Sequence, residues 1–364
     1  MTRPNTYPGR VTLKQVAGQA GVSLSTASLV FSGNGPVSEG TRTRVLAAAQ
    51  ALNYAGPNPV AANLRRGRCG VVGVVVEGSL RHALQDPYAL AVVNGLAEVL
   101  DSLPVGMLML SLRPQAPQEL RDRLRMQAMD GVVFFGCGPD AVPAAEHLRD
   151  RNISMVAMGQ PYLDGVRHVD IDERIGMLDL ARQLSDLGHR RVLAVAQRLA
   201  PADAPQGSTG AAVPIVDALA RAEFPDVLGR LAAIREVFGD SVPTVNAGAS
   251  TIDAGFAAVT EFLHASGSDR PTAIMTTSDQ LAFGAIQAVR AAGLDVPADV
   301  SVTGFDGIDP PNWAGNLTTV HQPGSDKGRA AARLVHSMIE GDPGADLLLP
   351  TTVRLGDSTG PPPW

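Results

Sequence analysis

From Cys69 to near its C-terminus, the chain alternates short apolar runs with amphipathic helical segments, a pattern that few folds can satisfy. Strand, helix and strand in this order indicate parallel sheets wound in the doubly wound manner, with ligands bound at the carboxyl ends of the strands. Because there are too many strands for one small sheet, we predict two α/β lobes with a cleft between them. The expected strands, buried on both faces, are residues 71–76, 105–110, 132–135, 155–158, 192–196, 273–276 and 300–305, and the helices include 88–103, 175–187, 254–264 and 280–292.

The first 68 residues differ from this pattern in their charge. They hold eight basic residues and one acidic residue, Glu39, whereas the rest of the chain holds 22 basic and 35 acidic residues. A basic segment on an acidic body is typical of a module that binds a polyanion such as nucleic acid, because neutralised phosphates release counterions. A solvated basic surface with no such partner is the alternative.

Three short helices are expected in this basic segment. The first begins after Thr12, which suits an N-cap, and stops at Gly21. Ser23 caps a second helix over residues 24–31, and a third covers residues 41–53. The first two, joined by a tight glycine turn, predict a helix-turn-helix. The outward face of the second helix carries the small polar residues Ser25, Thr26 and Ser28.

At these residues the sequence resembles the lactose-repressor/galactose-repressor (LacI/GalR) family of bacterial regulators. The resemblance is dense over the basic segment and continues through the body to about Thr359. The matching stretches of the basic segment are residues 11–17 (VTLKQVA), 20–28 (AGVSLSTAS), 37–42 (VSEGTR) and 52–54 (LNY). Those of the body include residues 130–133 (DGVV), 188–192 (GHRRV), 278–284 (SDQLAFG), 293–306 (GLDVPADVSVTGFD) and 348–350 (LLP).

In that family the second helix enters the major groove of DNA and reads base edges. The resemblance implies that Leu24, Ser25 and Ser28 take the base-reading positions, and that Thr12, Ser23, Thr26 and Asn34 lie on or near positions that contact phosphate. Leu29 stands where many members carry Arg. A leucine can contact a thymine methyl but cannot make the bidentate bond to guanine, and the alternative is that Leu29 packs inside its own unit.

Residues 57–68 read at first as a basic linker. The resemblance implies a hinge helix that folds on the operator, pairs with its twin from a second subunit and wedges a leucine into the minor groove. Leu64 takes that leucine position, Ala61 the small residue that allows close approach, and Asn58 a backbone-contact position. A helix this short needs the DNA and its partner for stability.

The resemblance also implies the domain organisation: an all-α helix-turn-helix domain and hinge, followed by a two-lobed domain like the periplasmic sugar-binding proteins. The expected boundaries are residues 1–56 for the DNA-binding domain, 57–68 for the hinge and 69–359 for the effector-binding and dimerisation domain. Within the last, the N-terminal lobe would take 70–170 and 304–324, and the C-terminal lobe 171–303 and 325–357. The tail, 360–364, is expected to be disordered.

Four residues of the body are candidates for effector binding. Asp279 follows an expected strand and matches the family position that accepts effector hydroxyls, although it also suits the N-cap of the next helix. Phe305 offers an aromatic face to a sugar ring, and Asp306 follows it, with lobe packing as its alternative role. Tyr88 lies in the segment that corresponds to the first ligand-side loop.

One mismatch stands near Ala211, where sugar-binding members of the family usually place an arginine that clamps hydroxyls. No arginine is near it in the sequence, and an acid common in relatives is replaced by Gly307. The effector would therefore be less polar than a simple sugar, or effector sensing has changed or been lost.

Nothing in the sequence indicates an enzyme or a cofactor. The glycines around Cys137 lack the third glycine of a dinucleotide fingerprint, no GxSxG or GxxxxGK[ST] occurs, and the seven histidines lack metal-ligand spacing. The two cysteines, Cys69 and Cys137, fit a reducing compartment, and no signal peptide or membrane span is evident. We expect a cytoplasmic protein associated with the nucleoid, with no metal and no catalytic residue.

These observations predict a homodimeric repressor that binds double-stranded operator DNA and is released by a small-molecule effector, a sugar or related metabolite. One alternative is co-repression, in which the small molecule promotes DNA binding. Another is a cytoplasmic solute-binding module whose helical segment docks on a protein.

Overall fold

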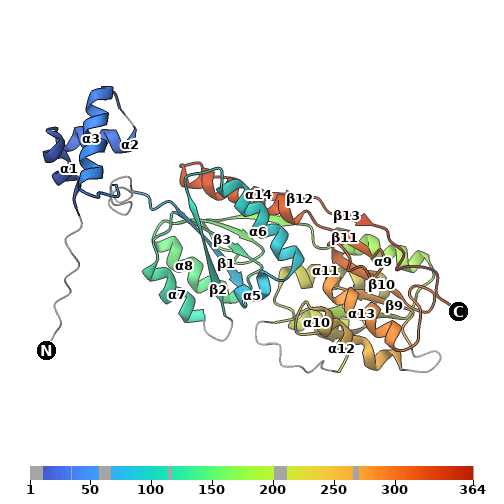
Figure 1. Cartoon of the computed structure of the whole chain (residues 1–364). Helices are drawn as coiled ribbons and strands as arrows, with labels where there is room; N and C mark the ends of the chain where they lie inside the picture. Colours follow the sequence, from blue (N-terminus) through green and yellow to red (C-terminus); the bar gives the residue numbers. More distant parts are fainter. Residues whose placement is uncertain are drawn as a thin grey trace, which may run out of the picture. The chain divides into compact units, whose positions relative to one another are not determined.

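The computed structural model describes residues 11–33, 35–56, 67–113, 117–200, 211–264 and 270–363. The chain forms two compact units, Met1–Cys69 and Gly70–Trp364 (Figure 1). The candidate residues Asn34, Asn58, Ala61 and Leu64 lie outside the described residues, so the DNA contacts expected of them stay predictions.

The first unit is built from the three expected helices, α1 (Leu13–Ala20), α2 (Leu24–Ser32) and α3 (Glu39–Ala51). Thr12 caps α1 in a capping box with Gln15, and Gly21 ends it at φ 65°. Ser23 caps α2 as predicted, while α3 begins earlier than expected because Ser38 is its cap. One apolar core joins the helices, formed by Val16, Ala17, Ala27, Val30, Val45, Ala48 and Ala49.

The second unit begins with a six-stranded parallel sheet. We call this sheet, together with the helices packed on it, the N-terminal lobe. The strand order is β12-β5-β4-β3-β1-β2. The strands are β1 (Val71–Glu77), β2 (Gly106–Leu112), β3 (Gly131–Phe135), β4 (Ser154–Met158), β5 (Val166–Ile171) and β12 (Leu347–Leu349). Helices α6 (Pro87–Leu100) and α14 (Gly324–Ile339) cover one face, while α7 (Pro117–Met126) and α8 (Val142–Asp150) cover the other. The short α5 (Leu80–Ala83) and a 3-10 turn (Pro139–Ala141) follow the ends of β1 and β3.

A seven-stranded sheet forms the other half, the C-terminal lobe, in the order β13-β11-β10-β9-β6-β8-β7. Its strands are β6 (Val192–Ala196), β7 (Val213–Pro214), β8 (Pro243–Asn246), β9 (Ala273–Thr276), β10 (Ser301–Asp306), β11 (Thr318–His321) and β13 (Thr352–Arg354). Helices α9 (Ile175–Asp186), α10 (Ile215–Arg221) and α11 (Pro225–Phe238) pack on one face, and α12 (Ile252–Leu263) and α13 (Asp279–Ala291) on the other. The central strands are parallel, and only the edge strands β7 and β13 run antiparallel.

The predicted parallel strands and two-lobed α/β architecture are confirmed, with one correction to the strands. Residues 105–110 were expected to be buried on both faces, but β2 is an edge strand and its first residues, Gly106 and Met107, are exposed. An edge strand has a neighbour on one side only, which periodicity does not reveal.

The expected division between the lobes is wrong for residues 304–323 and 325–349, whereas β13 belongs to the C-terminal lobe as expected. β11 pairs in parallel with β10, so both belong to the C-terminal lobe. The chain then crosses, and α14 packs along α6 in the N-terminal lobe (Figure 1). Two glycines allow this close packing: a Cβ added at Gly95 would lie 2.1 Å from the carbonyl oxygen of Ser325, and one at Gly328 would lie 2.1 Å from that of Val92.

The expectation of a disordered tail is also wrong for the described residues 360–363. The buried His189 ring donates from Nε2 to the carbonyl oxygen of Gly360 at 2.8 Å and accepts at Nδ1 from the Thr272 hydroxyl at 2.9 Å. The amide of Gly360 donates to Ser301 Oγ at 3.0 Å. These hydrogen bonds attach the tail to the C-terminal lobe.

Candidate functional site

The surface that could meet DNA is the exposed face of α2. Ser23 Oγ accepts from the amide of Thr26 at 3.0 Å and lies 2.8 Å from the hydroxyls of both Ser25 and Thr26. Leu24 is 52% exposed and Ser25 is exposed, whereas Ser28 is half-buried. The face therefore offers a hydroxyl cluster beside an apolar side chain, with no acidic residue in the helix.

Leu29 lies at the edge of this face. It is half-buried, and a Cβ added at Gly35 would lie 3.0 Å from Leu29 Cδ2. This contact favours the packing interpretation of Leu29 over base reading, while leaving part of the side chain accessible. Thr12, at the start of α1, is exposed.

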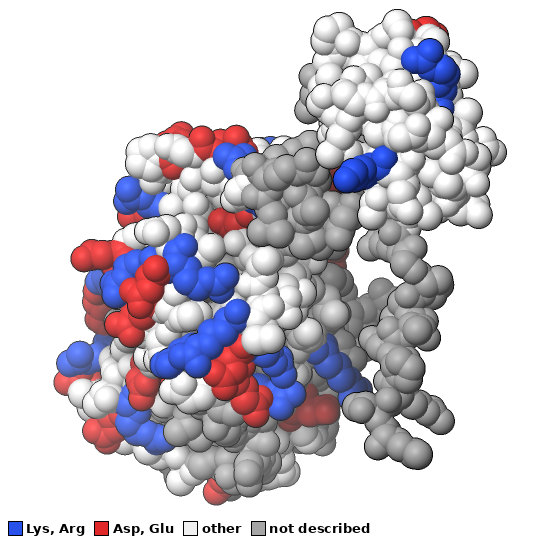
Figure 2. All heavy atoms as spheres, turned by 90° about the vertical axis from the view of Figure 1, so that its left-hand side faces the viewer, with Lys and Arg blue, Asp and Glu red and all other residues white. Residues whose placement is uncertain are grey.

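The charge of the two units differs among the described residues. The first unit shows Lys14, Arg42, Arg44 and Arg68 against Glu39, and its other four basic residues lie outside the described part of the chain. On the face of the second unit seen in Figure 2, acidic and basic side chains are intermingled. The excess of positive charge thus belongs to the helical unit.

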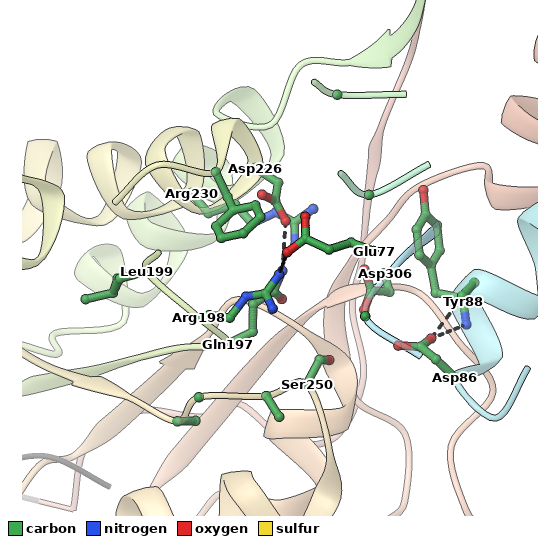
Figure 3. Close-up of a pocket in the computed structure, with 18 of the residues that line it drawn as sticks. Glu77, Asp86, Tyr88, Gln197, Arg198, Leu199, Asp226, Arg230, Ser250 and Asp306 are labelled. Atoms are coloured by element: carbon green, nitrogen blue, oxygen red, sulfur yellow. Dashed lines mark hydrogen bonds and ion pairs between the residues drawn. The ribbon is translucent and has the colours of Figure 1, made fainter. Parts of the chain in front are cut away.

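A cleft of about 1040 Å³ opens between the two lobes of the second unit. It is lined by the carboxyl ends of strands from both sheets, where a doubly wound fold places its ligands. Residues of β1, β3 and β4 contribute from the N-terminal lobe, and residues at or just after the ends of β6, β8, β10 and β11 contribute from the C-terminal lobe. Figure 3 shows polar side chains converging on this space from both lobes.

One ion pair spans the cleft. The Arg198 guanidinium, just after β6, donates to Glu77 Oε1 at the end of β1, and Glu77 Oε2 accepts from the amide of Gly138 at 2.5 Å (Figure 3). The Arg198 guanidinium also lies 4.5 Å from the ring centroid of Phe224. Burial raises the pKa of Glu77, against the lowering effect of Arg198. We call this Glu77–Arg198 pair the latch.

A second inter-lobe contact lies beside the latch. Gln160, after β4, donates from its amide nitrogen to the backbone oxygen of Glu223 at 2.9 Å. A Cβ added at Gly138 would lie 2.7 Å from the ring of Phe224, so that glycine lets the aromatic ring approach the N-terminal lobe. The lobes are therefore held together at the mouth of the cleft.

Arg230, from α11, is a deeply buried charge of the cleft wall. Its Nε and one terminal nitrogen donate to Glu173 Oε2 at 2.9 and 2.6 Å, and the other terminal nitrogen donates to the carbonyl oxygen of Thr277 at 2.6 Å. The guanidinium stacks 3.7 Å from the centroid of the Phe305 ring. Its hydrogen-bonding capacity is largely used within the protein, which fixes it as a charged wall.

Two of the four expected effector residues line the cleft. Asp306 ends β10 at φ 132°, and its Oδ1 accepts from the side-chain amide of Gln322 at 2.6 Å. Burial raises its pKa well above the usual range, against the lowering effect of Arg230. Tyr88 lines the opposite wall, and burial raises the pKa of its hydroxyl, with further contributions from Asp306 and Glu173. A left-handed backbone at a non-glycine residue is costly and is often found at functional sites.

The other two, Asp279 and Phe305, do not line the cleft. Asp279 is fully buried, its Oδ1 accepting from the Thr319 hydroxyl at 2.5 Å and its Oδ2 from the amide of Ile308 at 2.9 Å. Burial raises the pKa of Asp279 to about 6. It is the first residue of α13, whose N-cap is Ser278, so the expected capping role is wrong.

Phe305 was expected to offer its ring face to a sugar. It is fully buried in the apolar core of the C-terminal lobe, and the Arg230 guanidinium covers one ring face. Successive strand residues point to opposite sides, so Phe305 and Asp306 cannot both face one cavity.

Three arginines line the cleft, Arg198, Arg221 and Arg230, and none of them was predicted from the sequence. Ala211 does line the cleft, without an arginine, but Arg198 and Arg230 supply guanidinium groups from the end of β6 and from α11. The sequence around Arg230 does contain a pattern that indicates its burial. In α11 it follows Val227 by three residues and precedes Leu231 and Ile234, so it lies in the buried apolar stripe of the helix.

Neither a metal cluster nor a membrane helix is found among the described residues. No group of three or more His, Cys, Asp or Glu side chains there is placed to hold a metal ion. In the same part of the chain, no helix is long and apolar enough to cross a membrane.

Comparison with known proteins covers the whole chain. Residues 12–58 match the family of bacterial regulatory proteins of the lacI type, and residues 181–359 match a periplasmic binding protein-like domain. An HTH-type transcriptional regulator from Mycolicibacterium smegmatis is 32% identical over 374 aligned positions that cover both chains completely.

Solved structures show the same architecture. The lac repressor dimer bound to operator and the anti-inducer ONPF matches with a TM-score of 0.74 at 22% identity, covering 96% of this chain and 99% of the other. The complex of the transcriptional regulator CelR with cellobiose matches with a TM-score of 0.62 at 27% identity, covering 96% and 100%. With its helix-turn-helix unit, its two-lobed α/β unit and a full-length relative, the chain belongs to the LacI family of transcriptional regulators.

Proposed function

We propose that the chain is a homodimeric repressor, resident in the cytoplasm at the nucleoid, that binds a near-palindromic operator and is released by a small-molecule effector. The proposal of DNA binding rests on the face of α2, where Leu24 and a hydroxyl cluster are exposed on a basic unit. Small side chains allow the helix to approach base edges closely. The proposed contacts of Leu64 and the hinge rest on the sequence alone.

The cleft supports the effector half. Carboxylates, amides and aromatic rings line a space large enough for a sugar or a related metabolite, and the similar regulator CelR has been solved with cellobiose. No catalytic role is proposed, because the lining side chains are arranged to hold and orient rather than to activate a nucleophile.

The structure offers a route between the two halves. The amide of Gly70 donates to Asp130 Oδ2 at 2.6 Å, which anchors the chain where it enters the N-terminal lobe. From there β1 runs through the sheet from Val71 to Glu77, which carries the latch. A change at the latch is thus linked by one paired strand to the segment that follows the hinge. The coupling expected for such a system is about 1 to 3 kcal/mol.

The first test is selection of bound duplexes from a random pool, followed by anisotropy titrations of the best duplex at several salt concentrations. We expect a palindrome with a flexible centre and a steep salt dependence. Leu64→Ser should abolish specific binding while leaving ligand binding intact. If no duplex is selected with or without added metabolites, the repressor proposal is wrong and the solute-binding alternative gains support.

The sign of the ligand effect then decides between release and co-repression. A ligand that lowers operator affinity supports the proposed repressor, whereas one that raises it supports co-repression. A ligand that binds tightly and leaves operator affinity unchanged contradicts both.

A further inference from the structure

Lysine is rare in this chain, which has Lys14 and Lys327 among 30 basic residues. Lys327 lies in the first turns of α14, within the buried stripe that contains Gly324, Gly328 and Ala331. Its side chain lines the effector cleft, although the residue is only 5% exposed. A basic residue in the apolar stripe of a helix needs either an internal partner or a function.

Within the described residues, the Lys327 ammonium has neither a hydrogen bond nor an ion pair. The contrast with Arg230, on the other side of the cleft, is direct: Arg230 is equally buried but is bonded to Glu173 and to Thr277. Glu173 is also the carboxylate whose pKa responds to Lys327, yet its pairing is with Arg230. The ammonium lines the cleft with its three donors unused by the described residues, so it is available to a ligand that enters the cleft.

A second donor lies on the neighbouring helix. A Cβ added at Gly324, one turn before Lys327, would lie 3.0 Å from the Tyr88 ring, so α14 and α6 hold these two residues on the same wall. The Tyr88 hydroxyl also has no hydrogen-bond partner within the described residues. Asp306 is the acceptor that influences Tyr88 most strongly, and it lines the same cleft. The cleft therefore combines two free donors on this wall with a carboxylate acceptor on the opposite wall.

The charge around the cleft restricts the ligand. Seven carboxylates and four Lys or Arg side chains line it, and Arg198 and Arg230 are already paired with carboxylates. An anionic ligand would meet this surplus of negative charge, whereas a hydroxyl group can accept from an ammonium and donate to a carboxylate at once.

Building on the proposed function, we propose that Lys327 and Tyr88 form a hydroxyl-binding subsite that anchors an uncharged, polyhydroxylated effector to the N-terminal lobe and discriminates against phosphorylated or carboxylated analogues. Lys327 donates to one hydroxyl oxygen of the ligand, and Asp306 accepts from a hydroxyl of the same ligand. Lys327 is thus a specificity-determining residue of the effector cleft.

The test uses the full chain with Lys327→Met, which removes the ammonium and keeps the apolar stem. Arg333→Met is the matched control, because Arg333 is an exposed cation on the same helix. Calorimetric titrations use glucose, ribose and cellobiose beside the corresponding sugar phosphates and uronates. We expect a neutral sugar to bind the unmodified protein, with about tenfold or greater loss in Lys327→Met and none in Arg333→Met.

Two measurements separate binding from folding. Without ligand, Lys327→Met should melt at the same temperature as the unmodified protein or higher, since the ammonium makes no hydrogen bond or ion pair with the described residues that the substitution would remove. Because the chain has two lysines, reductive methylation with labelled formaldehyde gives a simple NMR spectrum. The Lys327 signal should shift on addition of the sugar, and the Lys14 signal should not.

Several results would overturn the subsite. A lower melting temperature of ligand-free Lys327→Met would assign Lys327 to structure, and binding of charged sugars alone would refute the ligand class. If a neutral sugar binds both proteins equally and releases the operator, the subsite is wrong and the proposed function stands. If none of these sugars binds while the operator does, the subsite and the effector half both fail, and the DNA-binding half remains.

Discussion

Removing one side of the latch should have a different effect from removing the other. Glu77 is 4% exposed and Arg198 is 21% exposed, so the carboxylate is the deeply buried partner. Arg198→Met leaves that carboxylate without its cation, whereas Glu77→Gln removes the buried charge itself and keeps an acceptor for the amide of Gly138. Comparing the two single substitutions therefore measures the cost of burying the Glu77 charge, and not only the attraction between Glu77 and Arg198.

The magnitude follows from burial. Breaking a fully buried pair by removing one partner costs about 3 to 5 kcal/mol, and the partial exposure of Arg198 reduces this to about 2 kcal/mol. Opening of the cleft lets water reach Glu77 and so limits the loss. Glu77→Gln should cost less than about 1 kcal/mol, and adding Arg198→Met to it should cost little more.

Urea unfolding followed by tryptophan fluorescence is the assay, because Trp313 and Trp364 both belong to the second unit. The pH dependence gives a second reading. Burial already raises the pKa of Glu77, and loss of Arg198 raises it further. A raised carboxyl pKa means that the folded protein binds the proton more tightly, so the deficit of Arg198→Met should shrink as the pH falls. Equal losses in the two single variants, or a deficit that grows on acidification, would refute this reasoning.

Three more predictions rest on single contacts. Burial raises the pKa of Asp279 from 3.8 to about 6, so the ionised carboxylate is disfavoured in the folded protein and the free energy of unfolding should fall as the pH rises through this range. Asp279→Asn should flatten this pH dependence and add about 2 kcal/mol to the free energy of unfolding near pH 8, measured by urea unfolding. A loss of stability at that pH would contradict it. Ser23→Ala removes the cap of α2, so it should cost about 1 kcal/mol of helix stability and weaken operator binding in anisotropy titrations. Ser38→Ala removes the cap of α3 and should cost similar stability without a comparable loss of operator affinity. His189→Phe removes the hydrogen bond to Gly360, so carboxypeptidase should trim the C-terminus faster, and an unchanged rate would show that the tail is held by other contacts.

Local chemistry made the helical unit predictable. A capping hydroxyl, a glycine that can adopt a left-handed conformation and a helical apolar period all act within one turn of the chain, so Thr12, Gly21 and Ser23 had the expected roles. The apolar runs of β1, β2, β3, β4, β6, β9 and β10 were found because they too are local, whereas β5, β7, β8, β11, β12 and β13 were not predicted. Their order, the edge position of β2 and the crossing before α14 depend on contacts between residues far apart in the chain, and no local pattern specifies these.

Two of the four effector residues predicted from the sequence line the cleft, and the two errors have a geometric cause. Motif positions located the strand ends, but a shift of one residue along a strand reverses the direction of a side chain. Asp306 consequently faces the cleft while Phe305 is in the core. The missing arginine near Ala211 was misleading, because a cleft between two lobes can obtain its guanidinium groups from any element that reaches it.

The two buried cations of the cleft show where sequence and structure each contribute. Arg230 and Lys327 both interrupt the apolar stripe of a helix, and the sequence shows this equally for the two. The structure separates them. Arg230 is bonded to Glu173 and Thr277 and stacks on the Phe305 ring, so its charge supports the wall, whereas the Lys327 ammonium has no hydrogen bond or ion pair within the described residues. An ammonium whose partner is the proposed effector stabilises the liganded state of the cleft, and this state is the one that must differ in operator affinity if the protein is a switch.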